Sequence, residues 1–140
     1  MLSKSTEAAI ASMSRLAEAQ CHDEPPLTAS QIADCRNLQR PFVAKLLTVL
    51  SQNGLIVGNR GPRGGYRLAR SSAEITLLDI ARCFERIDHP LQCPFGPEYC
   101  QEGRPRCPVH DDLARLRDER AAFLGNTTLA VFCCTAPPKQ

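Results

Sequence analysis

The chain has no tryptophan, and aromatic residues make up only 5% of its 140 residues. It has no run approaching the roughly 18 apolar residues that cross a bilayer, so we expect no membrane partner. Its first residues mix polar and acidic side chains with apolar ones, whereas a secretory signal keeps an unbroken apolar region. The formal net charge of +2 is too small to indicate nucleic-acid binding by itself. These absences predict a cytoplasmic protein of one ordinary domain with an appendage.

Cysteine, by contrast, is abundant. Without a secretory signal, the 8 cysteines indicate metal binding or redox sensing rather than a disulfide framework. Cys93, Cys100 and Cys107 recur seven residues apart in CPFGPEYCQEGRPRCPVH. The prolines and glycines of this stretch break any helix, so we expect the three thiols on an irregular loop that a bound group holds in place.

The other cysteines give weaker signals. Cys21, Cys35 and Cys83 fall in or beside predicted helices and are expected to be small core residues. Cys133 and Cys134 are expected to react with oxidants, but the sequence shows no partner for either thiol.

Hydrophobic periodicity predicts a mostly α-helical fold with one small β-hairpin. Two helix starts carry capping patterns, Thr28 with Gln31 and Thr76 with Asp79. Helices are expected at residues 6–20, 28–33, 40–54, 76–84, 110–124 and 128–132, with Gly125 ending the long one, and strands at 55–59 and 66–69. We divide the chain into a winged helix-turn-helix DNA-binding domain (1–86), a cysteine-rich cluster-binding loop (87–109), a dimerisation helix with a short C-terminal helix (110–134) and a tail (135–140). The long helix has an apolar stripe among many charges, so we expect it to pack on a second copy of the chain.

The second helix of a helix-turn-helix motif enters the major groove with its N-terminal residues against the base edges. Gln39 and Arg40 carry donors suited to adenine and guanine, whereas Lys45, one turn later, is placed to meet phosphate. On their own, these side chains are equally consistent with the solvated positions of a core helix.

The glycine-rich hairpin that follows favours the DNA-binding interpretation. It carries Arg60, Arg63 and Arg67, and its glycines allow the backbone to approach a phosphate or a narrow minor groove. The residues predicted to bind DNA are Thr28, Gln39, Arg40, Pro41, Phe42, Lys45, Arg60, Arg63, Gly64, Gly65 and Tyr66.

These motifs resemble the winged-helix repressor family that includes IscR, NsrR and CymR. The most specific are RGPRGGYRLAR and EITLLDI, and the likeness extends to STEAAIASMSRLA and to CPVHDDLARLRDERAAFLGNTTLAVF. The resemblance implies a homodimer in which the long helices cross and Arg60 of each wing reaches into the minor groove. The family often has a tyrosine at the position of Phe42, and its IscR-like members have a glutamate at the position of Ala44, so the target sequence is expected to differ.

Three thiolates can hold an iron-sulfur cluster that needs one further ligand. His110 follows Cys107 at C-x2-H spacing, and Glu7 is the second candidate, supplied by the first helix of the partner subunit. The resemblance supports both: the histidine, as in IscR-like members, implies [2Fe-2S], and the acidic residue, as in NsrR-like members, implies [4Fe-4S]. The six residues between successive cysteines depart from the five that are usual in both groups.

We therefore expect a dimeric repressor that binds a pseudo-palindromic operator and senses iron, oxygen, nitric oxide or redox state through a cluster, and that is not an enzyme. One alternative is a zinc-stabilised or thiol-based repressor without a cluster, since three cysteines and a histidine can also hold zinc, although close C-x2-4-C pairs are absent. A weaker alternative is an iron-sulfur electron carrier, but ferredoxin spacing is missing.

Overall fold

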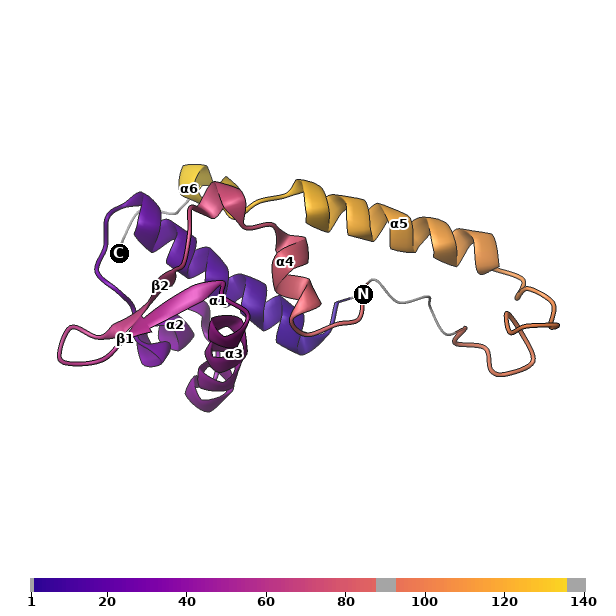
Figure 1. Ribbon diagram of the computed structural model, residues 1–140, viewed down its shortest axis with the longest axis horizontal. Helices are drawn as coiled ribbons and strands as arrows, with labels where there is room; N and C mark the ends of the chain where they lie inside the picture. The colour runs from indigo at the N-terminus through magenta and orange to yellow at the C-terminus, as the bar shows by residue number, and fades with distance from the viewer. Residues whose placement is uncertain (1, 88–92, 136–140) are drawn as a thin grey trace.

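The computed structural model describes residues 2–87 and 93–135, the last two by their main chain only. Residues 88–92 of the predicted cysteine loop and 136–140 of the predicted tail lie outside that part of the chain. The described part is mostly helical with one two-stranded antiparallel sheet, which confirms the predicted fold class (Figure 1). None of its helices is long and apolar enough to cross a membrane.

The first helix, α1 (Lys4–Cys21), begins earlier than predicted. Ser3 caps it, because its hydroxyl oxygen accepts a hydrogen bond from the main-chain N–H of Thr6 at 3.1 Å. One face of α1 is fully buried, so the helix forms the centre of the core. The buried apolar residues of that face include Ala9, Met13, Leu16 and Ala17.

The helix-turn-helix motif consists of α2 (Ala29–Arg36) and α3 (Arg40–Gln52). The predicted capping box is confirmed: Thr28 and Gln31 exchange side-chain hydrogen bonds with each other's backbone N–H groups at 2.9 and 3.1 Å. Asn37 takes a left-handed conformation with φ of 55° and turns the chain from α2 into α3. Four apolar residues of α3 face the core: Val43, Leu46, Leu47 and Leu50.

The wing is the hairpin of β1 (Ile56–Asn59) and β2 (Gly65–Leu68), in which Ile56 pairs with Leu68 and Asn59 with Gly65. Only the base of the hairpin is buried. Its tip projects from the helices at one end of the molecule (Figure 1).

After the wing, a short 3-10 helix, η1 (Ser72–Glu74), leads into α4 (Leu77–Arg82), where the predicted Thr76–Asp79 capping box is present. The chain returns through α5 (His110–Asn126) and ends in α6 (Val131–Thr135). The segment between α5 and α6 is anchored on the strand-like stretch before α4. Main-chain hydrogen bonds of 2.9 Å join Leu77 to Thr127 and Leu129 to Ile75.

The expected end of α5 at Gly125 is wrong, because the helix continues to Asn126. The hydroxyl of Thr127 donates to the carbonyl of Phe123 at 2.8 Å, which satisfies one of the open carbonyls of the last turn. The chain then turns at Thr127 into its contact with Leu77.

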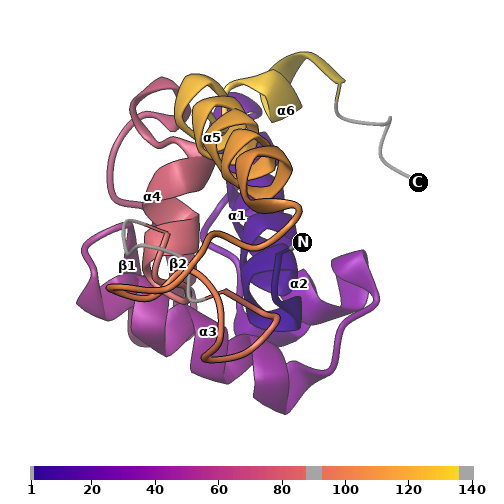
Figure 2. The same cartoon turned by 90° about the vertical axis from the view of Figure 1, so that its right-hand side faces the viewer.

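Anchored at its C-terminal end, α5 projects from the helical body as an arm (Figure 1). Figure 2, which looks along that arm, shows the cysteine loop at its outer end. The wing and the cysteine loop thus lie at opposite ends of the molecule in Figure 1. Within one chain, α5, α4 and α1 form a packed route between them.

Candidate nucleic-acid interface and metal centre

The start of α3 presents the predicted groove-reading residues at the surface. Gln39, Arg40, Pro41 and Lys45 are all exposed. The Arg40 guanidinium, however, already has a partner: its Nε and Nη2 donate to the two carboxylate oxygens of Asp34 at 3.1 and 2.8 Å. This hydrogen-bonded pairing raises the pKa of Arg40 above its usual value and orients the guanidinium along the outer surface of the motif.

Phe42 differs from these neighbours because it is half-buried. It lines a shallow, largely apolar depression between α3 and the first turns of α1, together with Leu38 and Glu7. Phe42 is therefore partly occupied with packing, and it connects the start of α3 with the helix that carries Glu7.

The wing supplies the second group of predicted DNA contacts. Arg60 and Arg63 are exposed at its tip. A hollow of about 350 Å³ separates the wing from the start of α2, and both Arg60 and Thr28 line it. The hollow places a cationic side chain opposite a helix N-terminus, an arrangement that suits an anionic backbone.

Gly65 and Tyr66, also predicted to bind DNA, dock the wing on the rest of the domain. The main-chain N–H of Tyr66 donates to the carbonyl of Leu27 at 2.6 Å, and the N–H of Leu27 donates back at 3.0 Å. Gly65 has φ of 153°, and a Cβ there would lie 2.7 Å from the Leu27 main chain. A Cβ on Gly64 would lie 2.5 Å from the carbonyl oxygen of Asn59. At both glycines the main chain lies so close to another stretch of main chain that a side chain would not fit.

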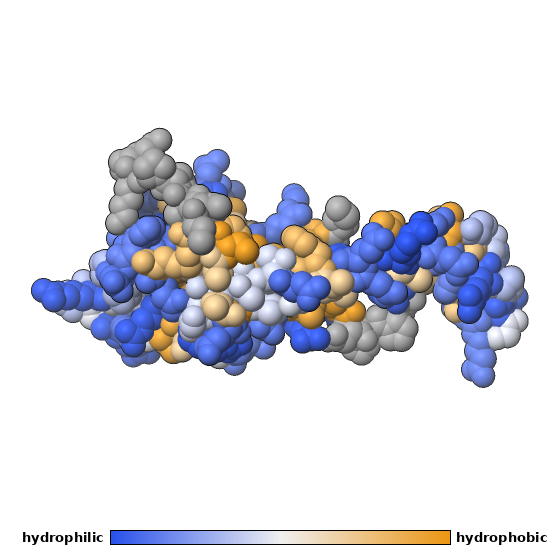
Figure 3. All heavy atoms as spheres, turned by 90° about the horizontal axis from the view of Figure 1, so that it is seen from above, coloured by the Kyte–Doolittle hydropathy of each residue, from blue (hydrophilic) through white to orange (hydrophobic). Residues whose placement is uncertain are grey.

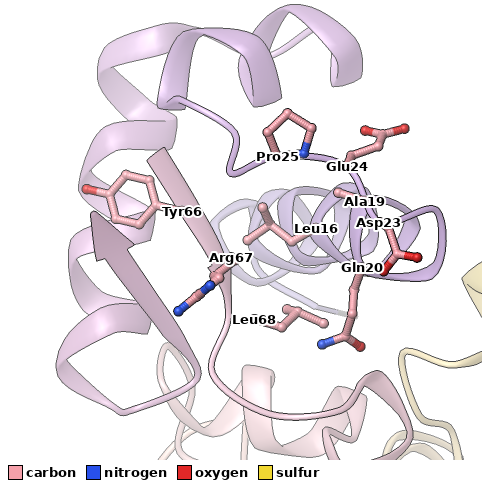
Figure 4. Close-up of a pocket in the computed structure, with 9 residues that line it drawn as sticks. All are labelled: Leu16, Ala19, Gln20, Asp23, Glu24, Pro25, Tyr66, Arg67 and Leu68. Atoms are coloured by element: carbon pink, nitrogen blue, oxygen red, sulfur yellow. The ribbon is translucent and has the colours of Figure 1, made fainter. Parts of the chain in front are cut away.

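The base of the wing packs against the last turns of α1. A small pocket of about 180 Å³ lies between them, and Figure 4 shows Leu16 of α1 and Leu68 of β2 among the residues that line it. The carboxylate of Glu24 at the rim is paired with Arg15 at 2.7 Å. Movement of α1 would therefore be transmitted directly to the wing.

The cysteine loop brings the three predicted thiols together. The Sγ atoms of Cys93, Cys100 and Cys107 all lie within 4.8 Å of one another, with Cys107 buried and the other two half-buried. Cys100 has a left-handed backbone with φ of 61°, and its N–H donates to the carbonyl of Pro105 at 2.8 Å. This local turn folds the loop back so that residues seven apart share one site.

Hydrogen bonds at this site favour a thiolate at one position. The main-chain N–H of Cys107 donates to Cys100 Sγ at 3.2 Å, and this bond, helped by His110, lowers the pKa of the Cys100 thiol to about 7. Burial raises the pKa of the Cys107 thiol. Of these two thiols, Cys100 is therefore the one that ionises at the lower pH, and its thiolate can begin metal binding.

The first turns of α5 complete the site. His110, Leu113 and Arg117 line the same pocket of about 200 Å³ as the three cysteines, because the spacing i, i+3, i+7 places them on one helix face. His110 Nδ1 lies 3.4 Å from Cys100 Sγ. Within the described part of the chain, Nε of Arg117 is buried without a hydrogen bond. Arg117 was not predicted, although its spacing from His110 was a usable signal.

Glu7, the other predicted ligand, is exposed on α1 and is not among the residues that line this pocket. Among the described residues of one chain, the structure brings His110 to the cysteines and leaves Glu7 in the depression beside Phe42.

The expectations for two of the remaining cysteines are wrong. Cys21 is exposed and forms a disulfide with Cys133, for which the sequence showed no partner. Cys35 is exposed rather than part of the core, because it lies on the outer face of α2. Cys83 is half-buried and donates to the carbonyl of Asp79. The side chain of Cys134 lies outside the described residues.

Together, the helix-turn-helix, the arginine-bearing hairpin and the thiol pocket on a separate helical arm define a winged-helix regulator with a potential metal site. A family model described as Rrf2, iron-dependent transcriptional regulator, matches residues 2–135. The chain belongs to the Rrf2 family of transcriptional regulators, which bind DNA.

Curated relatives agree with this assignment. A putative HTH-type transcriptional regulator of Aquifex aeolicus is 33% identical over 71% of this chain and 69% of its own length. The transcriptional regulator IscR of Serratia proteamaculans is 31% identical over 76% of this chain. The match spans 64% of that IscR.

Solved structures show the same architecture. CymR of B. subtilis, described as the global cysteine regulator, has a TM-score of 0.77 at 27% identity, covering 98% of both chains. IscR of T. potens has a TM-score of 0.74 at 25% identity, covering 98% of this chain and 88% of its own. The predicted family is thereby confirmed.

Proposed function

We propose that this protein is a homodimeric transcriptional repressor whose affinity for a pseudo-palindromic operator depends on an iron-sulfur cluster. The observation that carries the proposal is the convergence of three thiols and an imidazole in one pocket at the end of α5. Soft thiolate ligands are those that iron-sulfur clusters prefer. The description of the family as iron-dependent transcriptional regulators agrees with such a centre.

Cys93, Cys100, Cys107 and His110 would hold the cluster. A thiolate-bound cluster is anionic and supplies one-electron chemistry and reactivity toward oxygen and nitric oxide. The buried Nε of Arg117, which has no hydrogen-bond partner among the described residues, favours an anionic occupant of this pocket. Histidine ligation corresponds to the [2Fe-2S] form that the resemblance implied, and Glu7 of a partner subunit corresponds to [4Fe-4S].

A second copy of the chain is the proposed partner of α5. Leu116 and Phe123 on this helix are each 59% exposed, and they lie seven residues apart on one face. Figure 3 shows hydrophobic and hydrophilic residues side by side along the projecting arm. An isolated amphipathic helix in this position gains its stability by covering its apolar side chains, so pairing of two arms is expected.

Signal transfer would be a shift between two populations of the dimer. A ligated loop fixes the N-terminal end of α5, and the C-terminal end of α5 is anchored on α4 and on the strand-like stretch before it. α4 packs on α1, and α1 contacts the wing. A fixed loop would therefore set the distance between the two winged helix-turn-helix domains of the dimer. Loss of the cluster would release that constraint and change operator affinity.

The test is anaerobic purification followed by visible absorption and by quantification of iron, sulfide and zinc per chain. We expect charge-transfer bands with matched iron and sulfide in the wild type, and their loss in Cys100→Ala. Cys35→Ala is the matched control, because this exposed thiol lies outside the pocket. Colourless protein with stoichiometric zinc after anaerobic purification would overturn the cluster.

Zinc is the second candidate because of the thiol separations. A tetrahedral zinc ion with Zn–S bonds of about 2.3 Å would hold its sulfurs about 3.8 Å apart. The observed upper limit of 4.8 Å needs only a small closure to meet that value. In that case the metal would only stabilise the loop at the end of α5. The protein would still bind DNA, but without a signal from a cluster.

A further inference from the structure

Cys21 and Cys133 form a second sulfur site, separate from the cysteine loop. They lie 112 residues apart in the sequence, at the end of α1 and within α6, and their Cα atoms are 5.7 Å apart. This Cα separation falls within the range that a disulfide can bridge. Neither residue lines the pocket formed by Cys93, Cys100 and Cys107.

The two sulfurs differ in access. Cys21 is exposed, whereas Cys133 is half-buried, with the hydroxyl of Ser72 at 3.5 Å from its Sγ. An exposed thiol with a shielded partner is the arrangement in which one sulfur meets a small reagent and the other resolves the product. Cys35, exposed on α2, is a free thiol and lacks such a partner among the described residues.

The pair sits where three elements meet. Gln20, next to Cys21, donates from Nε2 to the carbonyl of Arg70 at 3.0 Å and accepts from the N–H of Ser72 at 2.8 Å. These residues form the exit from the wing, and Figure 4 shows Gln20 at the end of α1 beside the base of β2. The disulfide therefore ties α6 to the point at which α1 holds the wing.

We propose that Cys21 and Cys133 are a reversible redox modification site that exchanges with low-molecular-weight disulfides of the glutathione type. The Cys21 thiolate attacks one sulfur of the small disulfide, which forms a mixed disulfide and releases one small thiolate. The Cys133 thiolate then attacks the Cys21 sulfur and releases the second small thiolate. The protein loses two electrons and two protons, and the small disulfide gains both.

Oxidation would cross-link α6 to α1 and close a loop of more than a hundred residues, which restricts the unfolded chain. Reduction would leave α6 held on α1 by packing alone, and would loosen the tie between α6 and the wing exit. The disulfide would thus restrain the position of the wing, and this restraint does not depend on the cluster. Bond formation does not depend on the proposed function, whereas an effect on operator binding does.

The test uses the full-length protein in glutathione buffers of graded ratio, followed by acid quenching, alkylation and mass spectrometry. We expect loss of two alkylatable thiols, assigned to Cys21 and Cys133, and a thermal unfolding midpoint several degrees higher in the oxidised form. Cys21→Ser and Cys133→Ser should each abolish both effects. Cys35→Ser and Cys134→Ser, as matched controls, should retain them.

Hydrogen exchange gives a readout that a merely structural cysteine would not change. The amides of residues 70–77 and 129–133 should exchange faster after reduction in the wild type and be insensitive to the buffer in Cys21→Ser. The proposal is overturned if both thiols stay free at every ratio, if a mixed disulfide with glutathione persists at Cys21, or if exchange is the same in both redox states. Absence of operator binding in both redox states, with these effects present, would count against the proposed function alone.

Discussion

Arg40, at the start of the helix predicted to enter the major groove, is held by both carboxylate oxygens of Asp34 on the preceding helix. Both side chains are more than half exposed, so the pair contributes little to stability. Its effect is on orientation, because a guanidinium that binds guanine must point its two donors toward the base. If Arg40 binds a base as predicted, Asp34 either competes with DNA for its guanidinium or directs it onto one base pair.

Replacing Asp34 should relax sequence discrimination with little change in folding. We expect Asp34→Ala to bind a selected operator at least as tightly as the wild type, with the penalty for changing one base pair reduced by about 1 kcal/mol. Arg40→Ala should lose about 1–3 kcal/mol at that same base pair. The measurement is binding to single-base variants of the operator. Glu74→Ala, which removes the same charge elsewhere, should leave the discrimination intact.

Arg60, exposed at the wing tip, should contribute to DNA affinity independently of α3. We expect Arg60→Ala to weaken operator binding by about 1–3 kcal/mol and to reduce the slope of affinity against salt concentration by about one ion. Arg86→Ala removes an exposed arginine outside the predicted interface and is the control. Unchanged affinity and salt slope in Arg60→Ala would contradict the assignment of the wing to DNA.

The approach of β2 to Leu27 predicts a stability difference between two glycines of one hairpin. At Gly61, with φ of 108° and no atom within 4 Å of the position that a Cβ would take, alanine suffers only backbone strain, roughly 1 kcal/mol. At Gly65 alanine adds a contact of 2.7 Å with the main chain of Leu27, so we expect a loss of at least about 3 kcal/mol. Denaturant unfolding of both variants measures the difference. Equal losses of unfolding free energy in the two variants would mean that the wing can move away from Leu27 without destabilising the fold.

The elements that the sequence predicted well are those with local causes. The capping boxes of Thr28 and Thr76 each span four residues and could be identified before any fold was known. The thiol pocket could also be predicted from the sequence, because the turn at Cys100 and the first turn of α5 follow one another along the chain. Predicting the disulfide of Cys21 was not possible, because its partner is 112 residues away and only the completed fold joins them.

The same distinction applies to the DNA-binding surface. Sequence patterns placed Arg40, Lys45 and Arg60 correctly at exposed positions, since exposure depends on helical and strand periodicity. Phe42 and Tyr66, predicted with them, are half-buried. The patterns did not reveal that Asp34 holds Arg40, or that Gly65 and Tyr66 dock on Leu27. Both relationships join elements whose relative position is set by core packing, which a single sequence does not specify residue by residue.

The thiols of the metal-free loop should titrate at different pH values. The pKa of Cys100 is lowered to about 7 by the N–H of Cys107, so half of this thiol is ionised near neutrality. Burial raises the pKa of Cys107, so that thiol ionises at higher pH. Iodoacetamide labelling with peptide mapping should give a midpoint near pH 7 for Cys100 and a higher one for Cys107. Since binding needs thiolates, metal uptake should weaken as the pH falls below 7.

The 3.4 Å separation of His110 Nδ1 from Cys100 Sγ leads to a prediction about the fourth ligand. If His110 ligates the cluster, His110→Ala should shift the visible bands and shorten cluster lifetime in air, whereas His110→Cys should retain a cluster of lower reduction potential, because a thiolate donates more charge than an imidazole. Glu7→Ala should leave the spectrum unchanged. The opposite pattern would assign the ligand to α1 of the partner subunit and would join the cluster directly to the depression beside Phe42. Anaerobic absorption spectra and redox titrations of the three variants distinguish these two dimers, because only the second connects the cluster to the DNA-reading helix without passing through α5.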